Sequence, residues 1–144
     1  MEDRSILVVD DELLIRDLLY DFFQGQGWSI SVAENGEKAL EILDTKEVDI
    51  LLADIKMPDM DGMELTAEVR KAHPEIPVIL MTGYPSVDSA VAALREKVAD
   101  YIIKPFNINQ LFKVIESQVK ARLDGQHSGS DSAPVQPVQE KTDN

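Results

Sequence analysis

The chain has 144 residues and a net charge of −13, from 27 acidic and 14 basic residues. This length suits one domain with a buried core, and so acidic a chain repels DNA and anionic membranes, so we expect no direct nucleic-acid binding and no membrane binding. The absence of cysteine excludes disulfides, thiolate metal sites and cysteine nucleophiles and is typical of a cytoplasmic protein, and we find no pattern of a signal peptide or membrane span.

Short apolar runs alternate with helical patterns in the first part of the chain. Residues 6–9 form a continuous apolar run, which favours a strand that is covered on both faces. An apolar stripe over residues 14–22 then predicts a helix, which two glycines end. Residues 28–33 alternate in polarity and predict a less buried strand, and Asn35 can cap the short helix after it.

The same alternation continues to residue 119. Three further strands are predicted, at residues 48–53, 77–81 and 101–103. A capping residue opens the helix after each of them: Asp61, Ser86 and Asn107. Asp61 and Glu64 have the spacing of a capping box. Five strand–helix units in one direction predict a parallel sheet with helices on both faces and right-handed crossovers.

The composition changes near residue 124. Residues 124–144 are polar, rich in Gly, Ser and Pro, and without periodicity. Such a segment cannot bury enough apolar surface to offset the entropy of ordering. We therefore expect a disordered acidic tail over residues 124–144.

Polar residues follow four of the predicted strands at the points where these strands end. They are Asp10, Asp11, Asp54, Thr82 and Lys104. The carboxyl ends of parallel strands meet at one edge of a sheet, where ligands of such folds bind. Each residue alone has an ordinary explanation as a helix cap, a turn residue or an exposed side chain. Their convergence from separate segments favours a functional site.

Three carboxylates at one sheet edge need a counter-ion. Two carboxylates about 4 Å apart repel by roughly 4 kcal/mol even at an effective dielectric constant near 20. Ligands that are all oxygen favour a hard cation, and an open site with water and phosphate oxygens is typical of Mg²⁺. A lysine and a hydroxyl opposite the metal could stabilise a phosphoryl group in transfer. A carboxylate that accepts this group becomes an acyl phosphate.

Four motifs, in this order, resemble the receiver domains of two-component response regulators. They are Val8-Val-Asp-Asp-Glu12, Ala53-Asp-Ile-Lys-Met-Pro-Asp-Met-Asp-Gly62, Met81-Thr-Gly83 and Asp100-Tyr-Ile-Ile-Lys-Pro-Phe106. The resemblance covers residues 4–122. It implies one receiver domain over this range, with an α/β, flavodoxin-like (βα)5 fold: a doubly wound, five-stranded parallel sheet of order 2-1-3-4-5.

The resemblance also implies a role for each acidic residue. Asp54 would be the phosphoacceptor, and its phosphoryl group would come from a sensor histidine kinase or a histidine phosphotransfer protein. Asp11, Asp54 and the backbone carbonyl of Lys56 would bind Mg²⁺ (or Mn²⁺) directly, while Asp10 would act mainly through water. The chain would be a signalling switch and not an enzyme, although it would assist its own Mg²⁺-dependent phosphorylation and dephosphorylation.

The remaining site residues would sense the phosphoryl group. Lys104 would pair with a phosphoryl oxygen, and the Lys104–Pro105 bond is expected to be cis. Thr82 would hydrogen-bond the group and Tyr101 would swing inward behind it, which would change the surface of the fourth helix, fifth strand and fifth helix. A downstream protein would bind this face of a monomer or of a phosphorylation-dependent dimer.

Two bulky residues flank the expected path of water to the acyl phosphate. Lys56 lies two residues after the acceptor, and Tyr84 lies two residues after the threonine. We hypothesise that they shield the acyl phosphate and lengthen its lifetime; the alternative is that both are solvated loop residues. Lys97-Val98 stands where the family usually has Gly-Ala, and a helix can end there without glycine at a modest cost.

Three other interpretations are compatible with parts of the pattern. The chain could be the receiver part of a longer transcriptional regulator instead of a single-domain regulator. A phosphatase of the haloacid dehalogenase kind would need a second aspartate two residues after the nucleophile of its first strand, but Asp10 is followed there by Glu12. A receiver that is not phosphorylated would lack an acidic or acceptor residue, and here each such position is filled.

Overall fold

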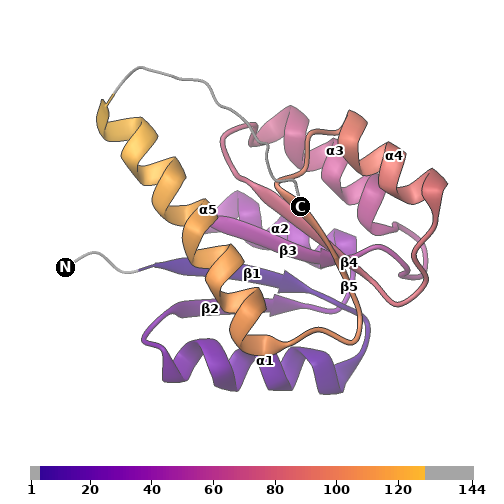
Figure 1. Cartoon of the computed structure of the whole chain (residues 1–144), viewed down its shortest axis with the longest axis horizontal. Helices are drawn as coiled ribbons and strands as arrows, with labels where there is room; N and C mark the ends of the chain where they lie inside the picture. The colour runs from indigo at the N-terminus through magenta and orange to yellow at the C-terminus, as the bar shows by residue number, and fades with distance from the viewer. Residues whose placement is uncertain (1–3, 129–144) are drawn as a thin grey trace, which may run out of the picture.

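The computed structural model describes residues 4–128, in which five strands alternate with five helices (Figure 1). The strands are β1 (Ser5–Val9), β2 (Ser29–Ala33), β3 (Ile50–Asp54), β4 (Val78–Thr82) and β5 (Asp100–Ile103). The helices are α1 (Leu13–Gly25), α2 (Gly36–Thr45), α3 (Gly62–Ala72), α4 (Val87–Arg95) and α5 (Ile108–Ser128). The strands form one parallel sheet of order β2-β1-β3-β4-β5, which confirms the predicted fold.

The register of the sheet brings the carboxyl ends of the strands to one edge. The pairs nearest this edge are Val9 with Ala53, Asp54 with Met81, and Thr82 with Ile103. Asp10 and Lys104 are the next residues after β1 and β5. The backbone therefore delivers the predicted site residues to the same end of the sheet before any side-chain contact is considered.

Helices cover both faces of the sheet (Figure 1). Ile6 and Val8 belong to a core cluster that includes buried residues of α1 and α5, such as Phe23 and Ile115. Leu7 belongs to the other core cluster, which includes buried residues of α2, α3 and α4. Because successive side chains of a strand point to opposite faces, a strand covered on both sides must be apolar throughout. This explains the continuous apolar run of β1. The edge strand β2 is more exposed, as its alternating sequence predicted.

Most helix starts follow the caps that the sequence predicted. The side chains of Asn35 and Ser86 accept hydrogen bonds from backbone N–H groups at the starts of α2 and α4. Asp61 and Glu64 form a complete capping box at the start of α3. Helix α4 ends at Arg95, and Lys97 takes a positive φ of 60°. This is the strained conformation that glycine would adopt at a lower cost.

The turn between β3 and α3 lies close to the backbone of Asp54. The N–H of Gly62 donates to the carbonyl of Ile55 at 2.9 Å. A Cβ atom at residue 62 would collide with the backbone carbonyl oxygen of Asp54 and would lie 2.8 Å from the Cα of Ile55. Glycine is therefore required here by close approach of two backbone segments, not by φ.

Helix α5 is longer than the periodicity predicted. It continues through residues 124–128, which the composition assigned to the tail, and the rest of the predicted tail, residues 129–144, lies outside the described residues. Leu123 follows Val119 at helical spacing and packs against the same core cluster, which extends the apolar stripe by one turn. Among the described residues, no helix is long and apolar enough to span a bilayer.

Candidate functional site

Three aspartates lie together at the carboxyl edge of the sheet, as predicted. Asp10 follows β1 and is fully buried, and Asp54 ends β3 with 5% of its surface exposed. Asp11 is exposed. One carboxylate oxygen from each of the three lies within 4.8 Å of the others. Such spacing is costly without a cation between the charges.

Lys104 reaches into this cluster from the end of β5. Its Nζ lies 2.9 Å from Oδ2 of Asp10, 3.1 Å from Oε1 of Glu12 and 3.4 Å from Oδ1 of Asp54. The backbone N–H of Lys104 donates to the carbonyl of Thr82 at 2.8 Å, and the Lys104–Pro105 bond is cis. The contact between Lys104 and Glu12 was not predicted from the sequence.

The ionisation of the site reflects a shortage of positive charge. Burial raises the pKa of Asp54 from 3.8 to about 6, the negative charge of Asp10 adds to this, and Lys104 opposes it. Burial also raises the pKa of Asp10 against the hydrogen bond from Lys104. Burial lowers the pKa of Lys104, but the hydrogen bond and charge of Asp10 outweigh it, so this pKa lies above its ordinary value. The single positive charge of Lys104 does not neutralise the three carboxylates that it contacts.

The turn between β1 and α1 is held by three hydrogen bonds that end on Asp10. Its backbone N–H donates to the carbonyl of Ala33 at 3.1 Å, and its Oδ1 accepts from the N–H of Glu12 at 2.9 Å. Its carbonyl oxygen accepts from Nη1 of Arg16 at 2.8 Å. The last of these contacts comes from a side chain that the sequence reasoning did not single out.

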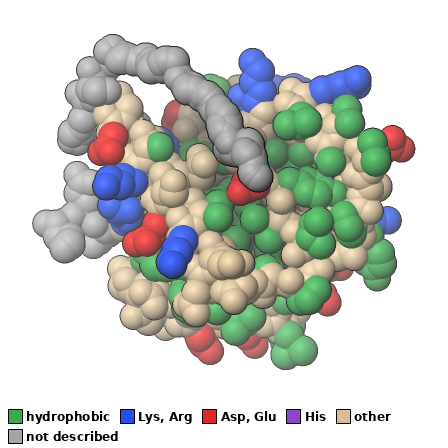
Figure 2. All heavy atoms as spheres, viewed as in Figure 1, with side chains coloured by type: hydrophobic (Ala, Val, Ile, Leu, Met, Phe, Trp, Pro, Cys, Tyr) green, Lys and Arg blue, Asp and Glu red, His purple; other side chains and the backbone are tan. Residues whose placement is uncertain are grey.

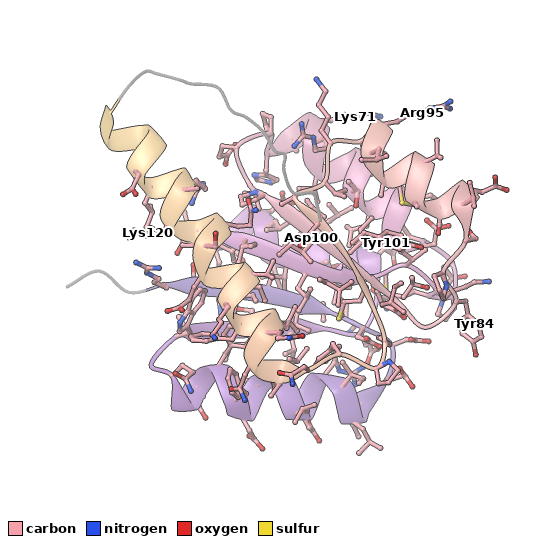
Figure 3. The ribbon with its side chains drawn as sticks, in the orientation of Figure 1. Lys71, Tyr84, Arg95, Asp100, Tyr101 and Lys120 are labelled. Atoms are coloured by element: carbon pink, nitrogen blue, oxygen red, sulfur yellow. The ribbon has the colours of Figure 1, made fainter. Side chains whose placement is uncertain are left out.

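The β4–α4 loop begins at Thr82, whose side chain is buried beside the cluster. Its Oγ1 accepts a hydrogen bond from the N–H of Tyr84 at 2.9 Å. The Tyr84 side chain is 74% exposed and projects from the surface in Figure 3. Nζ of Lys56, from the loop after β3, lies 5.6 Å from the centroid of the Tyr84 ring, within cation–π range.

A cavity of about 670 Å³ opens beside these residues. Asp11, Asp54 and Lys104 form its polar side, and Lys56 and Tyr84 also line it. Its apolar lining comes from the first helix and the segment after β5: Ile15, Leu18, Pro105 and Phe106. The space adjoins Asp54, so a group that approaches this carboxylate from solvent can enter there.

Tyr101 is the predicted site residue that the structure does not join to the carboxylate cluster. Its hydroxyl lies 2.6 Å from Oγ of Ser89 and accepts from the N–H of Ser86 at 3.4 Å, in the first turn of α4. The ring packs against the core cluster beneath α4 and lies deeper than Tyr84 in Figure 3. Two hydroxyls thus hold the β4–α4 loop: that of Thr82 at its start and that of Tyr101 at its end.

The donor set fits a hard divalent cation. Every side-chain donor in the cluster is a carboxylate oxygen, two of the three aspartates are buried, and Lys104 is the cation that pairs with these two carboxylates. The carbonyl of Lys56 is a further oxygen two residues beyond Asp54. Oxygen ligands with open positions for water are typical of Mg²⁺.

Comparison with known sequences identifies the family. Residues 6–116 match the response regulator receiver domain. The transcriptional regulatory protein ZraR of Klebsiella oxytoca is 43% identical over 110 residues, which are 76% of this chain and 25% of that protein. The chain thus spans about a quarter of the length of the curated relatives that it matches first.

Solved structures agree with the sequence match. A CheY-like receiver domain protein from Methanospirillum hungatei superposes with a TM-score of 0.83 at 29% identity, covering 85% of this chain and 98% of that one. The response regulator TrrA from Thermotoga maritima, solved in complex with Mg²⁺-BeF, has a TM-score of 0.72 at 36% identity, covering 80% and 98%. The chain therefore belongs to the response regulator receiver domains of two-component signalling systems.

Proposed function

We propose that Asp54 accepts the phosphoryl group that drives the switch. A carboxylate oxygen of Asp54 attacks the phosphorus of a phosphohistidine on a sensor histidine kinase or a histidine phosphotransfer protein. The P–N bond breaks, its electron pair stays on the imidazole nitrogen, and an acyl phosphate forms on Asp54. Hydrolysis of the acyl phosphate restores the carboxylate and releases inorganic phosphate.

One observation carries this proposal: the ammonium of Lys104 lies 3.4 Å from Oδ1 of Asp54, at the mouth of the cavity that adjoins this carboxylate. A phosphoryl group on Asp54 would take its negative oxygens toward Lys104, which is already held in place by Asp10. A fixed cation aimed at the developing charge is the main catalytic contribution available to a protein in phosphoryl transfer. Within residues 4–128, no lysine or arginine forms an ion pair with Asp59 or Asp61.

Asp10, Asp11, Asp54 and the backbone carbonyl of Lys56 would hold Mg²⁺, and Mn²⁺ has suitable ligand chemistry as well. The metal supplies charge neutralisation for the phosphoryl oxygens when it is bound. Burial of Asp10 and Asp54 and their contacts with Lys104 would hold both carboxylates in place for the metal. The Mg²⁺-BeF complex of TrrA supports Mg²⁺ as the cation for this chain.

Thr82 and Tyr101 would transmit phosphorylation to the surface. A phosphoryl oxygen that bonds the Thr82 hydroxyl would change the contact between Thr82 and the N–H of Tyr84, and with it the loop that ends at the Tyr101 hydroxyl. Figure 2 shows hydrophobic side chains gathered on the surface near α4 and β5. The exposed residues of this surface include Val87, Val91 and Leu94 of α4 and Ile103 of β5. This α4–β5–α5 face is our candidate for the downstream protein or a second phosphorylated copy.

Lys56 and Tyr84 would lengthen the lifetime of the acyl phosphate. Both line the cavity next to Asp54, and Nζ of Lys56 lies 5.6 Å from the centroid of the Tyr84 ring. Water must pass them to reach the phosphorus in line. If Lys56→Ala and Tyr84→Ala leave the dephosphorylation rate unchanged, the two residues are solvated loop residues only.

The receiver could work in either of two contexts. The chain could act alone, through protein contacts, or as the receiver of a longer protein like the DNA-binding transcriptional regulator NtrC of Escherichia coli. In either form we place it in the cytoplasm. The reading frame beyond residue 144 distinguishes the two.

The test of the proposed function is phosphorylation with a small donor. The protein is incubated with Mg²⁺ and acetyl phosphate, and the intact mass is measured. One phosphoryl group is expected on the wild type, none on Asp54→Ala, and far less without metal. Asp59→Asn is the matched control because Asp59 is an exposed aspartate of the adjacent loop, and it should be phosphorylated normally. A folded wild type of unchanged mass would contradict the proposal.

A further inference from the structure

Arg16 contacts the peptide unit that joins Asp10 to Asp11. Its Nη1 donates to the carbonyl oxygen of Asp10 at 2.8 Å. Arg16 lies on α1 and is half-buried, and its backbone N–H is separately bonded to the carbonyl of Glu12 at 3.2 Å. The guanidinium therefore ties α1 back to Asp10, the residue that follows β1.

This contact restrains the orientation of the peptide that leads into Asp11. The peptide bond is planar, so a fixed carbonyl oxygen on Asp10 fixes the N–H and the Cα position of Asp11. The other two contacts of the turn hold the N–H and the side chain of Asp10 and do not bond the carbonyl oxygen of this peptide directly. The exposed side chain of Asp11 has no hydrogen bond within residues 4–128 that would hold it.

We propose that Arg16 is a positioning residue for the metal site, which presents Asp10 and Asp11 together to Mg²⁺ by fixing the peptide between them. The inference rests on the proposed function, because it assumes that these aspartates bind the metal. Removal of a partner that orients metal ligands typically lowers metal affinity by 10- to 100-fold. Arg16 touches the backbone of a ligand and not its carboxylate, so we expect about a tenfold effect, the lower end of this range.

The sign of the effect separates positioning from electrostatics. Arg16 is a cation near three carboxylates, so loss of its charge alone would strengthen the binding of Mg²⁺. Loss of positioning would weaken it. Arg16→Lys keeps the charge and one donor on a shorter, more flexible side chain, so it should recover part of the affinity that Arg16→Ala loses.

The experiment is calorimetric titration of the metal-free full chain with MgCl₂ for the wild type, Arg16→Ala, Arg16→Lys and Arg95→Ala. Arg95 is the matched control, since it is an exposed arginine of α4 away from the site. Arg16→Ala should raise the Mg²⁺ dissociation constant about tenfold. The dissociation constant of Arg16→Lys should lie between those of Arg16→Ala and the wild type, and that of Arg95→Ala should equal the wild-type value. In metal-free samples, the NMR amide signal of Asp11 should move in Arg16→Ala while signals of the sheet core stay in place.

Three other outcomes are possible, and each contradicts a different part of the proposal. An unchanged or lower dissociation constant for Arg16→Ala, with Mg²⁺ bound by the wild type, overturns the role of Arg16 alone. A wild type that binds no Mg²⁺ overturns the proposed metal site instead. If Arg16→Ala weakens binding but shifts amide signals throughout the sheet, and Arg16→Lys recovers nothing, the effect is general destabilisation and the positioning role is wrong.

Discussion

Replacement of Asp54 by asparagine should stabilise the metal-free protein near neutral pH. The two side chains have the same shape, but asparagine carries no charge. Asp54 is 5% exposed and its pKa rises from 3.8 to about 6, chiefly by burial and then by the charge of Asp10. A raised carboxyl pKa means that the fold disfavours the ionised form, so the native charge at this position is a cost to stability above pH 6.

The size of the effect follows from the pKa. Each pKa unit corresponds to about 1.4 kcal/mol, so the rise from 3.8 to about 6 corresponds to roughly 3 kcal/mol. Below pH 3.8 the carboxyl group is protonated in both the folded and the unfolded state and contributes no difference. Between pH 3.8 and about 6, Asp54 ionises in the unfolded state but stays protonated in the folded state, so the free energy of unfolding falls as the pH rises. The loss is complete above about pH 6. Asp54→Asn should therefore gain up to about 3 kcal/mol near pH 7 and little at the acid end of the window.

The assay is urea unfolding of the wild type and Asp54→Asn with a metal chelator, near pH 7 and near pH 4. The difference in the free energy of unfolding between Asp54→Asn and the wild type should shrink as the pH falls between 6 and 3.8. Asp59→Asn, which changes an exposed aspartate of the adjacent loop, is the control variant. A variant that is less stable than the wild type near pH 7 would refute the reasoning. An equal gain at both values of pH would show that the charge of Asp54 is not the cause.

Three further predictions concern the metal, the Asp54 turn and the α4 contact. Mg²⁺ at about 100 times its dissociation constant should raise the free energy of unfolding of the wild type by about 2.7 kcal/mol, and less for Asp11→Asn at the same concentration; equal gains would exclude Asp11 as a ligand. Gly62→Ala should destabilise the protein by roughly 3 kcal/mol in urea unfolding, because its Cβ meets the backbone of Asp54, while Gly25→Ala, with open space around it, should not. In a double-mutant cycle of Ser89→Ala and Tyr101→Phe, the two losses of stability should overlap by about 1 kcal/mol, and strictly additive losses would mean that the 2.6 Å contact contributes nothing.

The sequence predicted the burial of the strands and the meeting of the site residues, because these depend on local periodicity and on strand direction. The continuous run of β1 and the alternating run of β2 differ in burial as expected, since one is central and the other lies at the edge. Asp10, Asp54 and Lys104 could be predicted to meet, because parallel strands leave no other arrangement for their ends.

Contacts that depend on side-chain reach could not be predicted in this way. Glu12 and Arg16 belong to the start of α1, and their polar character alone is equally typical of a solvated helix. Only the three-dimensional path of the turn shows that one reaches Lys104 and the other the carbonyl of Asp10. The contact of Tyr101 with Ser89 likewise depends on how α4 packs over β5.

The electrostatics of the site connect its stability with its proposed signalling role. Asp10 and Asp54 are buried side by side although Lys104 offsets only part of their charge, and the raised pKa of each shows that the metal-free fold is destabilised there. Any cation that enters relieves this repulsion, so the same free energy that weakens the fold near neutral pH strengthens metal binding. A fully compensated cluster would be more stable and would bind Mg²⁺ less well. Asp54→Asn should accordingly stabilise the protein and weaken its affinity for Mg²⁺ together, and a variant that changed only one of the two would break this link.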